Sequence, residues 1–357
     1  MGAFRRRVLP KLLLIGVLAG LLAVERSLAE SERAERAAGS QVGRFLPLEE
    51  AEDLLVAAIT LAKQDGTSYL VGRSQGLWRC LDLYGTPVRE ASVQQLLAGV
   101  REAEGIVQSR DPQRAADYGL DTERAWRVTF HGPALMSDPD RDVVLEVEVG
   151  DTRPGLDGSY LRRPGRDAVW AVDSDPRTLL DDAPGGVPLL DPKIVPEAWP
   201  PQGVGIASVR LERADGQGFS LESREAELSP IDEARGMSPV RWVMLDPAGV
   251  ERPVLPVLAL SYLTFLRIAP WAEVIDPESL VERGIQTPEA QLIFTASDGS
   301  RLILVVGPPD AEGRRPVANI GMKCATLMGP EIHPLFVPDI ERMAFPGKNP
   351  WEPWLKR

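Results

Sequence analysis

The segment Gly72 to Gly76, which reads Gly-Arg-Ser-Gln-Gly, places Ser74 in the setting that most invites catalytic chemistry. It matches the pattern G-x-S-x-G, in which a strand-to-helix turn exposes a nucleophilic serine beside a histidine base and an oxyanion hole. Here the residues that follow, 77–81, have the character of a strand, and the chain has only two histidines to serve as a base. We therefore expect Ser74 to lie in a hairpin turn, and a serine hydrolase at Ser74 is the less favoured alternative.

The two histidines, His131 and His333, each lie near the end of an expected strand. A metal site needs further ligands at close spacing, and neither histidine has a second His or Cys at such a spacing. The alternating aspartates Asp138, Asp140 and Asp142 resemble a calcium loop, but the proline and arginine between them and the lack of a correctly placed Gly and Glu depart from that pattern. We expect a solvated loop there, with no metal and no cofactor.

The only cysteines, Cys80 and Cys324, lie far apart in the chain. An oxidising compartment would permit a disulfide, which requires Cα atoms within roughly 7 Å. Cys80 falls in an alternating strand, where a small buried thiol fits. We expect two free thiols and keep a disulfide as the alternative.

The C-terminal segment 349–357 carries two tryptophans, Trp351 and Trp354, with a proline between them. Such a sequence does not suit a helix interior, and exposed aromatic side chains often anchor interfaces. We predict a partner contact at these tryptophans. The alternative is a tail that packs back on its own domain.

The length, composition and charge of the chain indicate its domain number and exclude one class of partner. The chain has 357 residues, 44% of them hydrophobic, a formal net charge of -12 and a pI near 4.9. That length and hydrophobic content suit about two globular domains. Binding to nucleic acid depends on Lys and Arg displacing counterions from phosphates, so the negative charge excludes nucleic acid as the main partner.

The N-terminus has the features of a targeting segment. Arginines 5–7 precede an uncharged apolar run from Leu12 to Val24, followed by Ser27-Leu28-Ala29. Positive charges stay on the cytoplasmic side, so the rest of the chain is expected outside the cytoplasm. We favour an uncleaved anchor over residues 8–24, with cleavage after Ala29 as the alternative. The expected location is the cytoplasmic (inner) membrane, with one pass and an extracytoplasmic soluble part, periplasmic in a Gram-negative cell.

An internal repeat organises the soluble part. Residues 59–71 and 209–221, 150 positions apart, both read as apolar alternation around an Asp-Gly pair, which is typical of a β-hairpin. Each predicted hairpin is followed by a strand with a tryptophan (Trp78, Trp242) and then by an apolar helical stretch (93–100, 257–266). The second stretch is apolar nearly all round, so we expect it to be buried between two layers, for which the two copies are one option.

A glycine then recurs at an offset of 165, as Gly119 and Gly284, before further strands. The predicted fold class is α+β, with two tandem copies of a mostly antiparallel β module that each hold one main helix. The expected boundaries are a signal anchor or signal peptide at 1–29, a tether at 30–53, repeats at 54–182 and 205–340, a Pro/Gly-rich linker at 183–204 and a tail at 341–357.

This order of elements resembles the family called domain of unknown function 4340. The resemblance rests on the Trp78 strand, the helix after it, Tyr118 to Asp121 with the strands that follow, and the Trp170 strand. It implies a membrane-anchored bacterial protein that accompanies ABC-type transport systems similar to those linked with gliding motility. Gln286 stands where Asp121 does, so any role of that aspartate would be kept in one copy only.

The sequence therefore predicts a non-enzymatic, membrane-anchored accessory or scaffold protein with protein partners in a transport-associated assembly. The alternatives are a periplasmic ligand-binding module that uses the cleft between the repeats and, less favoured, the hydrolase at Ser74.

Overall fold

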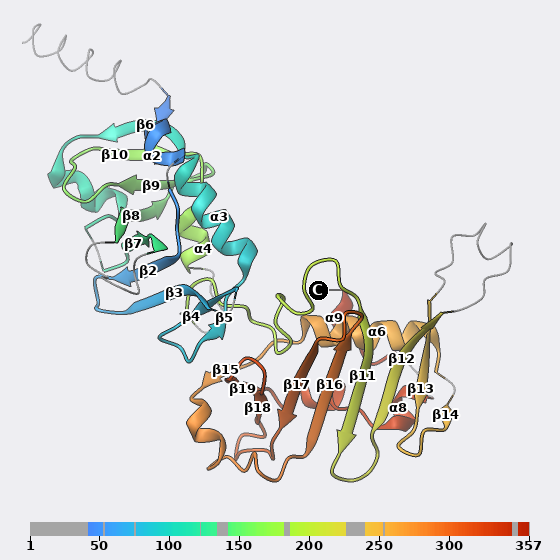
Figure 1. The fold of residues 1–357 in the computed structure, drawn as a ribbon. Coiled ribbons are helices and arrows are strands. Elements are labelled where there is room, and N and C mark those ends of the chain that lie inside the picture. Colours follow the sequence, from blue (N-terminus) through green and yellow to red (C-terminus); the bar gives the residue numbers. More distant parts are fainter. Residues whose placement is uncertain are drawn as a thin grey trace, which may run out of the picture.

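The chain folds into two antiparallel β-sheets, one in each half (Figure 1). This computed structural model describes residues 42–52, 54–74, 76–121, 123–133, 142–181, 186–225, 240–252, 254–344 and 349–356. The predicted anchor at 1–29, with its cleavage point after Ala29, therefore lies outside the described residues. Within the described part, no helix has the length and apolar character needed to cross a membrane.

Among the described residues the first sheet has ten strands, in the order β1-β6-β10-β9-β8-β7-β2-β3-β4-β5. They are β1 (Gly43–Arg44), β2 (Ala58–Lys63), β3 (Ser68–Ser74), β4 (Leu77–Cys80), β5 (Thr86–Pro87), β6 (Glu104–Ser109), β7 (Trp126–His131), β8 (Val143–Thr152), β9 (Ser159–Arg162) and β10 (Val169–Val172). The helices of this half are α2 (Leu48–Glu52), α3 (Glu90–Arg101), the 3-10 helix η1 (Pro112–Tyr118) and α4 (Pro176–Asp181).

The second sheet has nine strands within the described residues, in the order β14-β13-β12-β11-β16-β17-β18-β19-β15. They are β11 (Ile206–Arg213), β12 (Phe219–Glu225), β13 (Val240–Leu245), β14 (Glu251–Arg252), β15 (Glu273–Ile275), β16 (Ala290–Ala296), β17 (Arg301–Val306), β18 (Arg315–Asn319) and β19 (Cys324–Met328). The helices are α6 (Pro256–Ile268), the 3-10 helix η4 (Pro277–Leu280), α7 (His333–Phe336), α8 (Ile340–Ala344) and α9 (Glu352–Leu355).

The second sheet repeats the strand order of the first, β1 apart, when β2 is matched to β11 and each later strand to its successor. The registers also correspond. Trp78 lies opposite Arg73, and Trp242 lies opposite Ser223, which is 150 positions after Arg73. The offset between matched residues is 150 at Arg73 and Ser223 and 164 at the two tryptophans. The additional residues of the second half lie in segment 226–239, which is outside the described residues.

Two glycines have matching backbone conformations. Gly119 follows η1 with φ of 71°, and Gly284 follows η4 with φ of 75°. Their N–H groups donate to the carbonyls of Ala116 and Val281, both at 3.1 Å. Gly119 is the left-handed C-cap of η1, and Gly284 lies four residues beyond Leu280, the last residue of η4. In each half the left-handed glycine precedes the central strands.

Helix α3 is amphipathic and lies beside α4 against the first sheet (Figure 1). Glu90 in its first turn and Arg101 in its last turn complement the helix dipole. Its buried residues recur at three-to-four spacing and are Ser92, Val93, Leu96, Leu97 and Val100.

Helix α6 differs from the expectation that an apolar helix is buried all round. It is buried toward the second sheet and the C-terminal segment, but Val257 is 60% and Leu260 53% exposed. It does not lie between the two halves (Figure 1).

The prediction of a tether at 30–53 is wrong for the last residues of that range. Strand β1 pairs with β6, and the side chains of Phe45, Leu46, Ala51 and Leu54 are buried in the main core. Residues 43–52 and Leu54 therefore belong to the first half rather than to a solvated tether.

The Pro/Gly-rich segment also differs from a linker in its packing. Residues 187–204 lack helices and regular strands, but Leu189, Leu190 and Trp199 are buried. Val88 forms a β-bridge with Leu190, and Lys193 forms one with Pro270 in the second half. The segment thus bonds to both halves, and one continuous core cluster runs through it.

Candidate functional site

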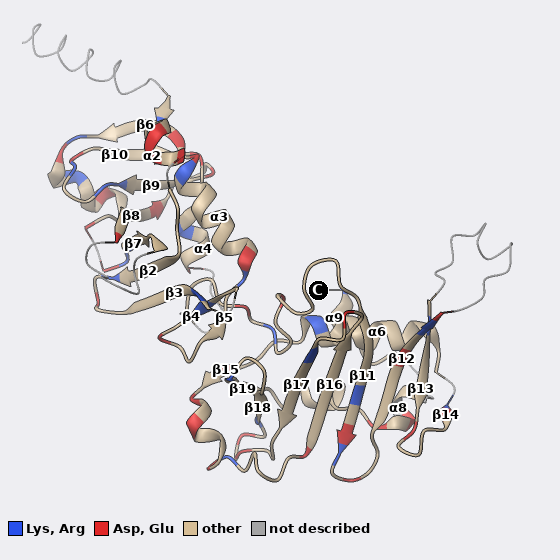
Figure 2. Ribbon diagram, viewed as in Figure 1, with Lys and Arg blue, Asp and Glu red and all other residues tan. Residues whose placement is uncertain are grey.

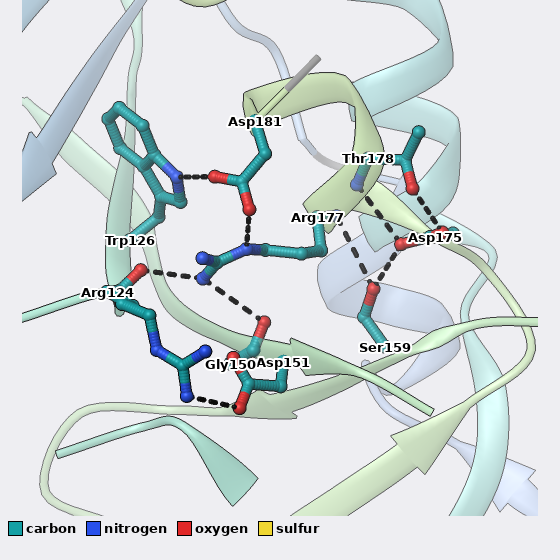
Figure 3. A network of polar contacts seen from close by, with 9 residues as sticks. All are labelled: Arg124, Trp126, Gly150, Asp151, Ser159, Asp175, Arg177, Thr178 and Asp181. Carbon is teal, nitrogen blue, oxygen red and sulfur yellow. Dashed lines mark hydrogen bonds and ion pairs between the residues drawn. The ribbon is translucent and has the colours of Figure 1, made fainter. Parts of the chain in front are cut away.

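A network of polar contacts surrounds Arg177 on α4 (Figure 3). The Arg177 side chain is 8% exposed and forms an ion pair with Asp181 through Nε. Its Nη1 donates to the carbonyl of Arg124 at 2.6 Å and to that of Gly150 at 3.4 Å. Asp181 in turn accepts a bond of 2.9 Å from Nε1 of Trp126. A buried guanidinium needs such acceptors, and here they tie α4 to the start of β7 and the end of β8.

The second group of hydrogen bonds in the cluster lies at the N-terminus of α4. The buried Ser159 hydroxyl donates to Asp175 at 2.5 Å, and Asp175 accepts from the N–H and hydroxyl of Thr178 at 3.2 and 2.6 Å. Asp175 is thus a helix N-cap followed by Pro176 in the first turn. We conclude that the cluster is architectural, because its donors and acceptors satisfy one another. Sequence reasoning missed it, although Asp-Pro-x-Thr is a helix-start signal that could have located α4.

Ser74 is the last residue of β3, and it pairs with Leu77 of β4. A strand follows the motif, so the strand-to-helix turn of a nucleophile elbow is not formed. His131, on β7 of the same sheet, bonds to another side chain: its Nε2 lies 2.9 Å from the hydroxyl of Thr60.

His131 sits beside a second buried polar group. Its Nδ1 and the Oδ2 of Asp142 each lack a hydrogen-bond partner among the described residues. Burial lowers the pKa of His131, and the Asp142 carboxylate opposes that shift. Thr60, His131 and Asp142 have the residue types of a catalytic triad. Thr60 is, however, in mid-strand, paired to Leu70 on one side and Thr129 on the other, so its backbone has no free N–H pair for an oxyanion.

His333 lies in a cluster of charged side chains. Its Nε2 is 3.2 Å from Oε1 of Glu289 but without the geometry of a hydrogen bond, and the other oxygen of Glu289 accepts from Arg315 at 2.7 Å. Burial lowers the pKa of His333 to about 4, with Glu289 opposing the shift and Arg315 and Arg213 adding to it. The histidine is therefore neutral at pH 7.

The cysteines and the aspartate loop carry no site in the described part of the chain. Cys80 and Cys324 are both free and buried, which confirms the expected thiols, and burial raises the pKa of each to about 11. Such thiols are poor nucleophiles. Asp138 and Asp140 lie outside the described residues, and no group of three His, Cys, Asp or Glu in the described part could hold a metal ion.

The tryptophans of the tail do not form an exposed patch. Trp351 is completely buried, with its ring centroid 5.4 Å from that of Tyr262 and its Nε1 donating to the Leu335 carbonyl at 3.0 Å. Trp354 is partly buried, 5.8 Å from Phe265. The prediction of a partner contact at Trp351 is therefore wrong, because this side chain is covered by the residues of its own chain around α6.

The junction between the halves has little space for a ligand. A cavity of about 10 Å³, lined by Asp191, Trp271, Asn319 and Cys324 among others, has room for about one water molecule. Nδ2 of Asn319 is buried there without a partner among the described residues, which suits such a water. Burial raises the pKa of Asp191, although two backbone N–H groups bond to it.

A larger hollow lies between α6 and the sheet, with a volume of about 450 Å³. Sequence reasoning missed it because α6 was expected to be buried all round. It is lined mainly by apolar side chains, with Lys193 and Arg267 as its charged members.

Comparison with protein families gives one result. A family model described as Domain of unknown function (DUF4340) matches residues 78–288, more than half of the chain. The match begins in β4, crosses the connecting segment and ends just before β16. No curated protein and no solved structure matches the chain.

Proposed function

Because the chain belongs to the family of the domain of unknown function DUF4340, we propose that it is a non-enzymatic, extracytoplasmic accessory or scaffold protein. The observation that carries this proposal is the joining of two similar sheets into one unit by the buried segment 187–204. A unit of this kind presents surfaces at a fixed spacing. The buried polar groups around Arg177 support the same view, since they hold the fold together.

We further propose that the two halves are tandem copies of one module. The matched strand orders, the equivalent registers of Trp78 and Trp242, and the conformations of Gly119 and Gly284 support this duplication. The first copy then spans 43–181 and the second 205–344, with segment 187–204 between them.

The N-terminal sequence supports the location that we propose. The arginines at 5–7 and the apolar run that follows support an anchor in the cytoplasmic membrane, with the two halves outside the cytoplasm. The resemblance to accessory components of ABC-type transport systems supports a membrane complex as the place of action.

The experiment is affinity purification of the full chain from detergent-solubilised membranes, after a carbonate wash. The proposal expects the chain in the washed pellet and a membrane protein recovered with it in constant ratio. A freely soluble chain, or one that is recovered alone, would contradict it.

A second arm addresses the enzymatic alternative. The purified chain and its Ser74→Ala variant are assayed on generic ester substrates. Turnover that the variant loses would establish the hydrolase instead. For the ligand-binding alternative, a thermal-shift screen with metabolites would have to raise the unfolding temperature, which the cavity of about 10 Å³ between the halves does not favour.

A further inference from the structure

Helix α6 carries an apolar stripe on its outer side. Val257, Leu260 and Ile268 are 60%, 53% and 38% exposed, and Thr264 lies between the last two at helical spacing. Arg267 is the only charged residue of the helix, which is why α6 is almost entirely tan in Figure 2. Exposed apolar stripes of this kind mark interaction surfaces.

The stripe borders the hollow between α6 and the sheet, which we call the α6 groove. Its apolar lining comes from both α6 and the strands, and consists of Ile206, Trp242, Leu260, Leu263 and Ile268. With about 450 Å³ it can take one or two large apolar side chains. The 13 residues of α6 extend about 20 Å, enough to align a helix of three to four turns.

The charged side chains that line the groove are all positive. Lys193 and Arg267 are its charged lining residues, and no described Asp or Glu lines it. Lys193 has Glu197 as a partner at 3.1 Å, whereas Arg267 makes no ion pair with any described residue. In a chain with a net charge of -12, this positive rim is a local reversal of sign. An occupant that complements it carries carboxylates.

We propose that the α6 groove docks an amphipathic helix of a partner protein, with large apolar side chains on one face and Asp or Glu along its flank. A second copy of this chain fits less well, because a two-fold contact would bring Arg267 toward its own counterpart without a carboxylate from the groove. Helix-in-groove recognition uses anchors at three-to-four spacing, which the stripe on α6 matches. The inference rests on the proposed accessory role, since it names the kind of partner and its docking surface.

The test uses the full chain in detergent and two synthetic 18-residue helical peptides labelled with a fluorophore. Both carry the same leucines at three-to-four spacing, and their flanks are Glu in one and Lys in the other. Fluorescence anisotropy should show micromolar binding of the Glu peptide and at least tenfold weaker binding of the Lys peptide. Leu260→Glu should weaken binding of the Glu peptide at least tenfold, and Arg267→Glu should reverse the preference between the peptides.

The matched control is Leu156→Glu, because Leu156 is 63% exposed in the first half, away from α6. It should bind the Glu peptide as the unmodified chain does, and circular dichroism should show all variants folded. Equal binding of both peptides, no binding, or binding unchanged by Leu260→Glu would overturn the proposal.

Three further outcomes would assign the groove to another occupant and so overturn the proposal. The first is sedimentation that shows a dimer lost in Leu260→Glu. The second is Arg267-dependent binding to phosphatidylglycerol vesicles with no binding of the Glu peptide. The third is peptide binding only after residues 226–239 are replaced by Gly and Ser, which would mean that this chain's own segment fills the groove. If a membrane protein still co-purifies with Leu260→Glu in full amount, the accessory role stands and only the groove is excluded.

Discussion

Arg79 of the first half donates a hydrogen bond of 3.0 Å from Nη1 to the backbone carbonyl of Met322 in the second half. The same nitrogen donates to the carbonyl of Gly85 at 3.1 Å, and Arg79 is only 6% exposed. This side chain therefore joins the edge of the first sheet to the turn between β18 and β19. It adds a direct contact to those that pass through segment 187–204.

Replacing Arg79 with Met should weaken this junction. Two partly buried carbonyls would lose a charged donor, so the free energy of unfolding should fall by about 1–3 kcal/mol. Because the lost bond spans the halves, thermal unfolding by calorimetry should broaden or separate into two transitions. The control is Arg166→Met, since Arg166 is exposed and makes no ion pair with a described residue, and it should leave a single transition. An unchanged transition in Arg79→Met would show that the connecting segment alone joins the halves.

Arg177→Met tests the architectural reading of the cluster in Figure 3. The substitution leaves the carbonyls of Arg124 and Gly150 without their buried donor and Asp181 without its ion pair. We expect the free energy of unfolding, measured in urea, to fall by about 2–3 kcal/mol. This loss is at the low end of those seen when a buried ion pair is broken, because Asp181 is 44% exposed.

Arg124→Met is the matched control for that experiment. The Arg124 side chain is 69% exposed, and its pair with Asp151 is at the surface, so the change should be within about 0.5 kcal/mol. Equal losses in the two variants would mean that the buried guanidinium adds nothing beyond a surface charge.

The local signals in the sequence identified the hairpins well. Asp65-Gly66 and Asp215-Gly216 form the predicted turns, with φ of 90° and 78° at the glycines. In each turn the aspartate accepts from the N–H two residues later, at 2.8 and 2.9 Å. Such turns are decided within four residues, so a short stretch of sequence is enough to predict them.

The features that could not be predicted depend on docking between distant segments. The composition of 183–204 indicates an irregular chain, but not that Trp199 packs 5.6 Å from the ring of Phe294. In the same way, two tryptophans beside prolines do not reveal whether α6 will cover them. The role of Arg177 could not be predicted either, because the two carbonyls that accept from it belong to residues 53 and 27 positions away, and only Asp181 is near it in the sequence.

The pH dependence of stability should report on His333. Its folded pKa of about 4 lies below the unfolded value of about 6.5, so the unfolded chain binds more protons between these values. Stability is therefore complete above about pH 6.5 and is lost as the pH falls toward 4. Between about pH 7.5 and pH 5 the loss should be roughly 2 kcal/mol, measured by urea unfolding.

His333→Gln should remove most of this dependence over the same interval. His131 has a pKa lowered by burial, so it contributes a loss of the same sign, and His131→Gln is the comparison that separates the two. A His333→Gln variant with the slope of the unmodified chain would contradict the assignment to His333.

Gly119→Ala and Gly284→Ala should destabilise the two halves in parallel. Both glycines have a positive φ, and an added Cβ would come within 2.5 Å of the Asp151 carboxyl carbon and 2.9 Å of the Pro308 ring. Gly155 is the control, because its φ of 70° is the same but nothing lies within 4 Å of its Cβ position. Gly155→Ala should therefore lower the free energy of unfolding by about 1 kcal/mol, which is the cost of holding an alanine at positive φ. The other two variants should lower it by about 2 kcal/mol or more. Urea unfolding measures all three, and losses at Gly119 and Gly284 no larger than at Gly155 would show that the side chains of Asp151 and Pro308 leave room for a Cβ at these positions.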